Sequence, residues 1–180
     1  MIIKYLKLTS YFHLKQISIM AVLVSQVLSH WNHYFPHSSM SSNDVYSKID
    51  ELVKVHDMPG TKTERVSHKE GGFLSASREY FRVKRKELVF DVCVAPFGKS
   101  VFISWWLYES EGAMKSLLKF TKVGEFLNER AAKRTFYEAD EEAVFRACVH
   151  SCVLEAIEKL TEGTGQRLTE LERQIKEGGM

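Results

Sequence analysis

Two apolar runs separated by a turn signal constrain the fold of this chain more than any other feature of its sequence. Residues 88–97 (LVFDVCVAPF) and 101–108 (VFISWWLY) are bulky and apolar at nearly every position, which is typical of strands buried on both faces. Between them, Pro96 and Gly98 supply the fixed φ and the conformational freedom that a tight turn requires. Because each large side chain removed from water contributes roughly 1.5–3 kcal/mol, this pair predicts a central antiparallel hairpin.

The flanking segments extend that hairpin into a sheet. Strand signals also occur at 61–68 and 78–86, with a turn at Gly71-Gly72 between them. Helical signals occupy 44–56, 114–130 and 140–161, and a short edge strand is expected at 135–137, with Asp140 as the cap of the last helix. The order predicts an α+β fold, a four-stranded antiparallel meander at about 61–109 covered by N-terminal and C-terminal helices.

The N-terminal region carries a heptad-like pattern. Apolar residues from 14 to 35 alternate in spacings of three and four, which predicts a helix that ends before Pro36: Leu14, Ile17, Ala21, Val24, Leu28, Trp31 and Phe35. Such a helix either packs on its own domain or mediates self-association, and a signal peptide or membrane anchor is a further alternative. The chain therefore divides into an apolar helix or arm (1–40), a core domain (41–165) and a weakly amphipathic tail (166–180).

Charge is balanced overall but uneven along the chain. The formal net charge is +2, whereas residues 61–86 carry eight basic and three acidic side chains. In the strand at 78–86, alternate positions place one aromatic ring and four cations on a single face: Arg78, Tyr80, Arg82, Lys84 and Lys86. This face is expected to bind an acidic protein, a nucleic acid or a lipid headgroup, or to be a solvated, charge-protected sheet surface.

Trp105 and Trp106 are adjacent and must point to opposite faces of a strand, so only one of them can enter the main core. Trp106 is taken as the contact residue, because a second tryptophan outside the core is a candidate binding hot spot, and burial under the N-terminal helix is the alternative.

Asp91 lies inside the most apolar strand, where an unpaired carboxylate is costly to bury. It is either a general base near Cys93 or a structural acid bound to Arg82, Lys84 or a backbone amide. His150 is the remaining candidate partner for a catalytic site with Asp91 and Cys93, although no glycine-rich nucleophile motif accompanies it.

His30, His33 and His37 are spaced three and four apart, which on one helix face would suit a transition metal. No acidic or cysteine ligand lies near them in the sequence, so ordinary surface or hydrogen-bonded histidines are the alternative. The sequence implies neither a cofactor nor a small-molecule substrate.

The leading hypothesis is a non-enzymatic interaction or assembly protein, which contacts a protein or a second copy through 14–35 and an acidic partner through the basic strand. A small enzyme around Asp91, Cys93 and His150, and a peripheral membrane protein anchored by 14–35, are the alternatives. The three cysteines, an odd number, favour reduced thiols in a cytoplasm over a secreted disulfide framework.

Overall fold

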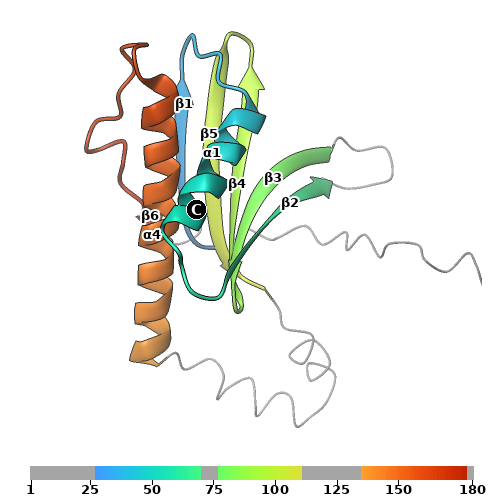
Figure 1. The fold of residues 1–180 in the computed structure, drawn as a ribbon, viewed down its shortest axis with the longest axis vertical. Helices are drawn as coiled ribbons and strands as arrows, with labels where there is room; N and C mark the ends of the chain where they lie inside the picture. The colour runs from blue at the N-terminus through green and yellow to red at the C-terminus, as the bar shows by residue number, and fades with distance from the viewer. Residues whose placement is uncertain (1–26, 70–76, 111–134, 178–180) are drawn as a thin grey trace, which may run out of the picture.

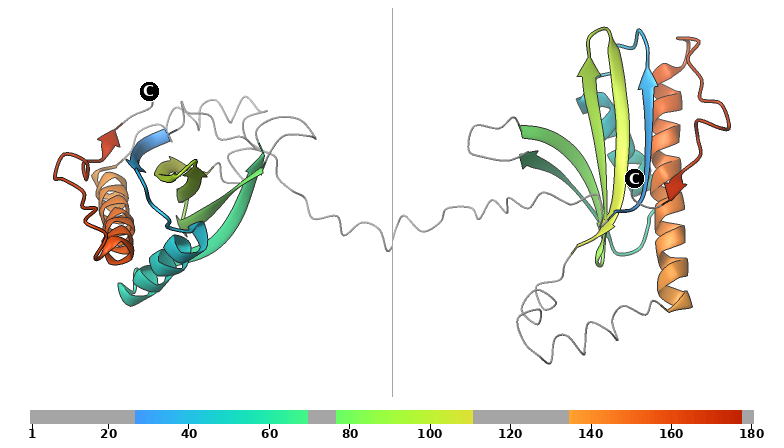
Figure 2. Two further views of the ribbon diagram at one scale, coloured as in Figure 1. Left: turned by 90° about the horizontal axis from the view of Figure 1, so that it is seen from above. Right: turned by 180° about the vertical axis from the view of Figure 1, so that it is seen from behind.

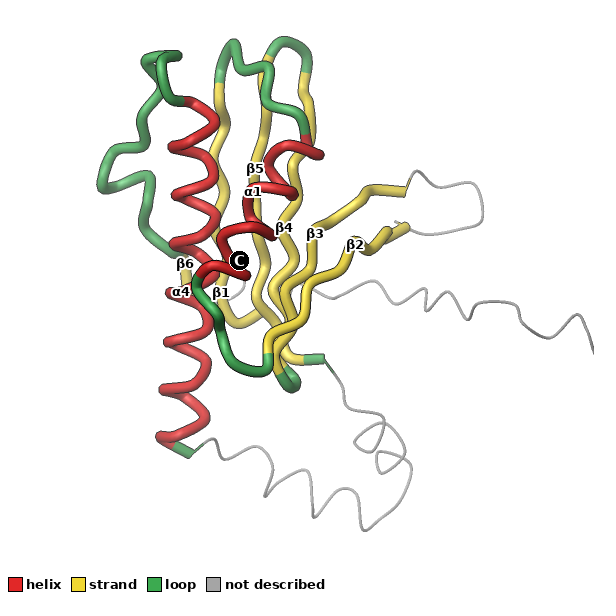
Figure 3. The backbone as a smooth tube through the Cα atoms, in the orientation of Figure 1, coloured by secondary structure: helices red, strands yellow, loops and turns green. Residues whose placement is uncertain are grey.

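The computed structural model describes residues 27–69, 77–110 and 135–177 and builds them into one sheet covered by two helices (Figure 1). The elements follow in the order β1 (Val27–Phe35), α1 (Ser42–Val55), β2 (Thr61–Lys69), β3 (Ser77–Arg85), β4 (Leu88–Phe97), β5 (Ser100–Glu109), α4 (Phe136–Thr161) and β6 (Lys176–Glu177). Every pairing is antiparallel, and the spatial order is β2-β3-β4-β5-β1-β6 (Figure 3). The α+β class is confirmed.

The predicted meander forms β2 to β5, with β2 at one edge of the sheet and the β4–β5 hairpin at its centre. β4 and β5 pair along their whole length, from Leu88↔Glu109 to Phe97↔Ser100, and Gly98 in their turn has a φ of 62°. Phe90 and Trp105 stack with ring centroids 4.4 Å apart and are fully buried under the helices. The central hairpin therefore supplies much of the sheet side of the hydrophobic core, as its sequence indicates.

β1 corrects the helix predicted for the N-terminal region. Residues 27–35 form a strand that pairs with β5, ending at Phe35↔Val101, while residues 14–26 lie outside the described part of the chain. Trp31 and Phe35 are four residues apart, a spacing that places them on one face of a strand as well as of a helix. The run of aromatic side chains from Trp31 to Phe35 favours a strand, and pairing with β5 decides between the two.

Both helices begin at side-chain caps. Ser41 caps α1 by accepting a hydrogen bond from the Asp44 amide at 3.1 Å. Thr135 and Glu138 form a capping box at the start of α4, so the predicted edge strand at 135–137 and the predicted cap at Asp140 are wrong. The predicted helix at 114–130 lies outside the described residues. Neither α1 nor α4 combines the length and the apolar character required to cross a bilayer.

The C-terminal segment packs against the sheet and α4 rather than forming a separate tail. Trp31 donates its indole N–H to the Glu172 carbonyl at 2.6 Å, and β6 pairs with β1. His150 Nδ1 accepts from Trp105 at 3.0 Å, while its Nε2 lies 2.8 Å from the Arg173 carbonyl. His150 is therefore a neutral imidazole that joins the sheet core to the C-terminal segment, and burial lowers its pKa.

Replacing His150 by Phe is expected to destabilise the protein by about 1–3 kcal/mol, because the Trp105 indole and the Arg173 carbonyl each lose a buried partner. Wild-type stability should also fall as the pH drops below about 6.5, since the unfolded histidine takes up a proton that the folded one resists. The His150→Phe variant should lose less stability over that range.

Urea unfolding from pH 7 to pH 5 measures both effects. Ser151→Ala, at the exposed neighbouring position, is the matched control and should leave the free energy of unfolding unchanged. An identical pH slope in wild type and His150→Phe would contradict the neutral bridging role.

Candidate functional site

The sheet has one face covered by helices and one that no described helix covers (Figure 2). Along β4, the side chains alternate between these faces, so that Phe90 and Val92 join the core while Asp91 and Cys93 point the other way. We call the second surface the open face. It is made of His30, Asn32, Tyr34, Lys62, Glu64, Val66, His68, Arg78, Tyr80, Arg82, Lys84, Val89, Asp91, Cys93, Ala95, Phe102, Ser104, Trp106 and Tyr108.

Strand register brings several predicted site residues into one row across the open face. Arg82 on β3 lies opposite Asp91 on β4, Asp91 lies opposite Trp106 on β5, and Trp106 lies opposite His30 on β1. Antiparallel neighbours on one face have closely spaced Cβ atoms, so these four side chains form a continuous band. The residues come from segments up to 76 positions apart in the chain, and only the sheet topology joins them.

Asp91 and Arg82 are the most heavily bonded side chains of this band. Asp91 Oδ1 accepts from Arg82 Nε at 2.7 Å, and its Oδ2 accepts from Arg82 Nη2 and Tyr108 Oη, each at 2.8 Å. His68 Nε2 lies 3.1 Å from the same Oδ2. Only 3 % of Asp91 is exposed, so the carboxylate is buried together with its counter-charge. The interpretation of Asp91 as a structural acid bound to Arg82 agrees with this geometry.

The electrostatics of Asp91 follow from these partners. Burial alone would raise its pKa, but the hydrogen bonds from Arg82 and His68 outweigh burial and hold the pKa below its ordinary value. The same burial raises the pKa of Tyr108, and the neighbouring Asp91 charge adds to the increase. Beside His68, the cluster therefore consists of an ionised carboxylate, a charged guanidinium and a protonated phenol, and the lowered pKa of Asp91 disfavours its acting as a proton acceptor.

The three candidate catalytic residues are not brought together. Cys93 is on the open face, two residues from Asp91, and burial raises the pKa of its thiol although Arg78 and Tyr80 lie against the sulfur and oppose that shift. His150 is on α4, bonded to Trp105 on the opposite face of the sheet. Asp91 and Cys93 therefore share no cleft with His150.

The two adjacent tryptophans point to opposite faces, as predicted. Trp105 is buried under α4, whereas Trp106 is half-buried on the open face. Trp106 stacks on His30 with ring centroids 5.1 Å apart and an interplanar angle of 16°. Four residues further along the same two strands, Tyr34 lies opposite Phe102. The open face therefore carries two pairs of rings beside the charged cluster.

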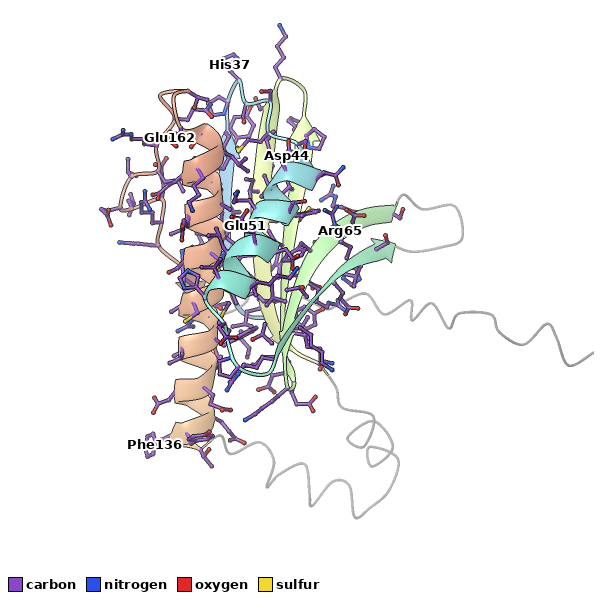
Figure 4. The ribbon with its side chains drawn as sticks, in the orientation of Figure 1. His37, Asp44, Glu51, Arg65, Phe136 and Glu162 are labelled. Atoms are coloured by element: carbon purple, nitrogen blue, oxygen red, sulfur yellow. The ribbon has the colours of Figure 1, made fainter. Side chains whose placement is uncertain are left out.

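The candidate metal histidines are dispersed. A strand places His30 and His33 on opposite faces, and His37 lies in the turn after β1 with a φ of 53° (Figure 4), so the shared helix face expected from their spacing is wrong. Burial lowers the pKa of His33, although the nearby Glu172 carboxylate opposes the shift. Within 27–69, 77–110 and 135–177, no group of three metal-ligating side chains is close enough to hold an ion.

Lys86 is the one member of the predicted basic row that lies elsewhere. β3 ends at Arg85, and Lys86 occupies the turn with a φ of 53°, where its ammonium binds Glu141 of α4 at 2.8 Å. Lys84 remains on the open face, directly opposite Lys62 of β2. The basic residues of the open face therefore include Lys62 on the neighbouring strand β2, whereas Lys86, beyond the end of β3, is not among them.

The two layers of the molecule carry opposite charge. Helices α1 and α4 contain nine acidic and four basic side chains, among them Asp44 and Glu51, which project from α1 in Figure 4. The sheet surface opposite these helices carries five cations and two carboxylates: Lys62, Arg78, Arg82, Lys84 and Lys176 against Glu64 and Asp91. Within the residues that the structure describes, charge is therefore polarised across the sheet, a distribution that orients an approaching charged partner.

Sequence reasoning did not single out His68, Lys62 or Tyr108 as members of the site. A signal was present for all three, and Lys62 and His68 share the even-numbered face of β2 with Glu64. Tyr108 is two residues from Trp106 and therefore on the same face of β5. What the sequence lacks is the cross-strand register that brings these side chains to Asp91.

Asp91→Asn should destabilise the protein by about 3 kcal/mol, because Arg82 and Tyr108 then face a neutral amide in a largely buried position. Thermal or urea unfolding measures the loss. Asp57→Asn is the matched control, since Asp57 is exposed in a turn with a φ of 44°, a conformation that asparagine also adopts. Equal stability of wild type and Asp91→Asn would exclude a structural ion pair.

A comparison with protein-family models, curated proteins and solved structures found no match to the chain. The function therefore has to be argued from the residues of the open face and the charge distribution around them.

Proposed function

We propose that the protein is an interaction module that binds an anionic macromolecule through its open face. The observation that carries this proposal is the pair Lys62 and Lys84, two lysines directly opposite each other on neighbouring strands. Like charges in that position destabilise a sheet, so their presence needs a compensating role. Neither lysine forms an ion pair with any residue that the structure describes. An anionic partner would supply the missing counter-charge.

Charge polarisation supports the same function. The acidic α1 and α4 layer repels a polyanion, while the sheet surface attracts it, so electrostatic steering would present the open face to the partner. Arg82 contributes little free charge, because Asp91 neutralises it at 2.7 Å. The attraction would therefore rest on the other cations of this surface, among which Lys62 and Lys84 are the pair that lies directly opposite each other.

The geometry favours binding over catalysis. Asp91 already has four hydrogen-bonding contacts and a lowered pKa, so it is poorly suited to act as a general base. Cys93 is 1 % exposed and its pKa is raised, which disfavours the reactive thiolate. As part of this proposal we place the protein in a reducing, cytoplasmic environment, in which free thiols persist.

The proposal predicts that Lys62→Glu with Lys84→Glu elutes from a heparin column at a much lower salt concentration than wild type, because two phosphate- or sulfate-pairing cations become repulsive. The double variant Lys99→Glu with Arg167→Glu makes the same change in net charge in the β4–β5 turn and in the loop after α4. That control should elute close to wild type.

Arg82 is left unchanged in this test, since reversing it would set two carboxylates against each other and disturb the fold. Circular dichroism melting verifies that both double variants remain folded. If the two double variants shift elution equally, binding follows net charge alone and the open face is not the site.

A further inference from the structure

We infer that the partner of the open face is single-stranded nucleic acid, whose bases stack on a ladder of side chains shared by β1 and β5. This inference rests on the proposed function, because it assigns the chemistry of the same anionic partner. The ladder has three rungs in register: His30 opposite Trp106, Asn32 opposite Ser104, and Tyr34 opposite Phe102.

The spacing of the ladder suits a strand of nucleotides. The two aromatic rungs are four residues apart, which at ~3.4 Å per residue separates them by roughly 13–14 Å. Asn32 is half-buried on the middle rung, where its amide offers both a donor and an acceptor to a base edge. Rings at both ends and an amide between them form a surface along which consecutive unpaired bases can be held.

Three of the four ladder rings are at least partly exposed, whereas His30 is only 5 % exposed. Tyr34 is 49 % exposed and its hydroxyl donates to Ser100 Oγ at 2.8 Å, while Trp106 and Phe102 are half-buried. Trp106 is also held against His30 in a stacked pair. Because these contacts restrain Tyr34 and Trp106, stacking a base on those two rings would cost little additional conformational entropy.

The cations lie where the phosphates of such a strand would pass. On the open face, β4 presents the short side chains of Asp91, Cys93 and Ala95 between the ladder and β3. Lys84 on β3 is two strands from β5 and Lys62 is one strand further, about 10–15 Å to the side of Tyr108, with which Lys84 is in register. The Trp106 rung is two residues along β5 from that position, and the Tyr34–Phe102 rung is six residues away, roughly 20 Å. A nucleic-acid strand could then place its bases over β5 and β1, on the ladder rings. Its sugar-phosphate backbone would face β3 and β2, toward Lys84 and Lys62.

Stacking distinguishes this partner from an acidic protein. The glutamate and aspartate side chains of an acidic protein would form ion pairs with the two lysines, but they have no planar ring to stack on the ladder. Every nucleobase has a π face, so aromatic rings beside a positive groove or surface bind single strands with little sequence preference. The combination of rings and unpaired lysines on one sheet face therefore favours nucleic acid.

The experiment measures the fluorescence anisotropy of a labelled oligothymidylate of about twelve nucleotides with the full-length protein. Tyr34→Leu with Phe102→Leu removes one aromatic rung and should weaken binding roughly 5- to 150-fold, the range expected for the loss of one stacked base. Phe136→Leu with Tyr137→Leu removes two exposed rings at the start of α4 and should leave binding unchanged. Binding should also quench Trp106, the one tryptophan of the three on the open face.

The alternatives give different outcomes. Oligothymidylate binding that is lost in Lys62→Glu with Lys84→Glu but unchanged in the ladder variant would overturn the stacking inference and leave the proposed function in place. Binding of poly-glutamate without oligothymidylate, or of a duplex as tightly as a single strand, would do the same. If no polyanion binds in a way that depends on Lys62 and Lys84, the proposed function fails as well.

Discussion

A charged group buried in the middle of the central strand sets the organisation of this protein. Asp91 cannot stay ionised among apolar neighbours unless donors reach it from both sides, and they come from three other strands: His68 on β2, Arg82 on β3 and Tyr108 on β5. Since a one-residue slip would turn any of these side chains to the helix-covered face, the cluster also specifies the register of the sheet. The open face, with its rings and lysines, depends on that register.

The two faces of β4 place different demands on the same ten residues. One face joins Phe90 and Val92 to the helices through close apolar packing, and the other holds Asp91 and Cys93 under polar and aromatic side chains. Because both faces of β4 are buried, its sequence is apolar at nearly every position, and Asp91 is the one charged residue. That exception is informative, because a carboxylate at such a position requires a specific partner, whereas another valine would not.

Local signals predicted the meander, α1 and most of α4, because turn residues and alternation are properties of nearby sequence. The cost of an unpaired charge also indicated a bonded Asp91, with Arg82 as one of three alternative partners. Local signals failed at β1, where aromatic residues at spacing four suit a strand and a helix equally and pairing with β5 decides. They also failed at Lys86, where the strand ends one residue earlier than alternation suggests. The aromatic ladder could not be predicted from the sequence, because each of its rungs pairs residues about 70 positions apart in the chain.

The position of β1 has a consequence for how the chain folds as it is synthesised. β1 is the first described strand, yet its sheet neighbours are β5 and β6, which are made much later. Until β5 leaves the ribosome, the backbone N–H and C=O groups on one edge of β1 lack the strand they pair with in the sheet, and those on its other edge lack β6 (Lys176–Glu177). Such long-range pairing slows folding and prolongs the exposure of an unpaired strand, so nascent chains of this protein are good candidates for chaperone binding during synthesis.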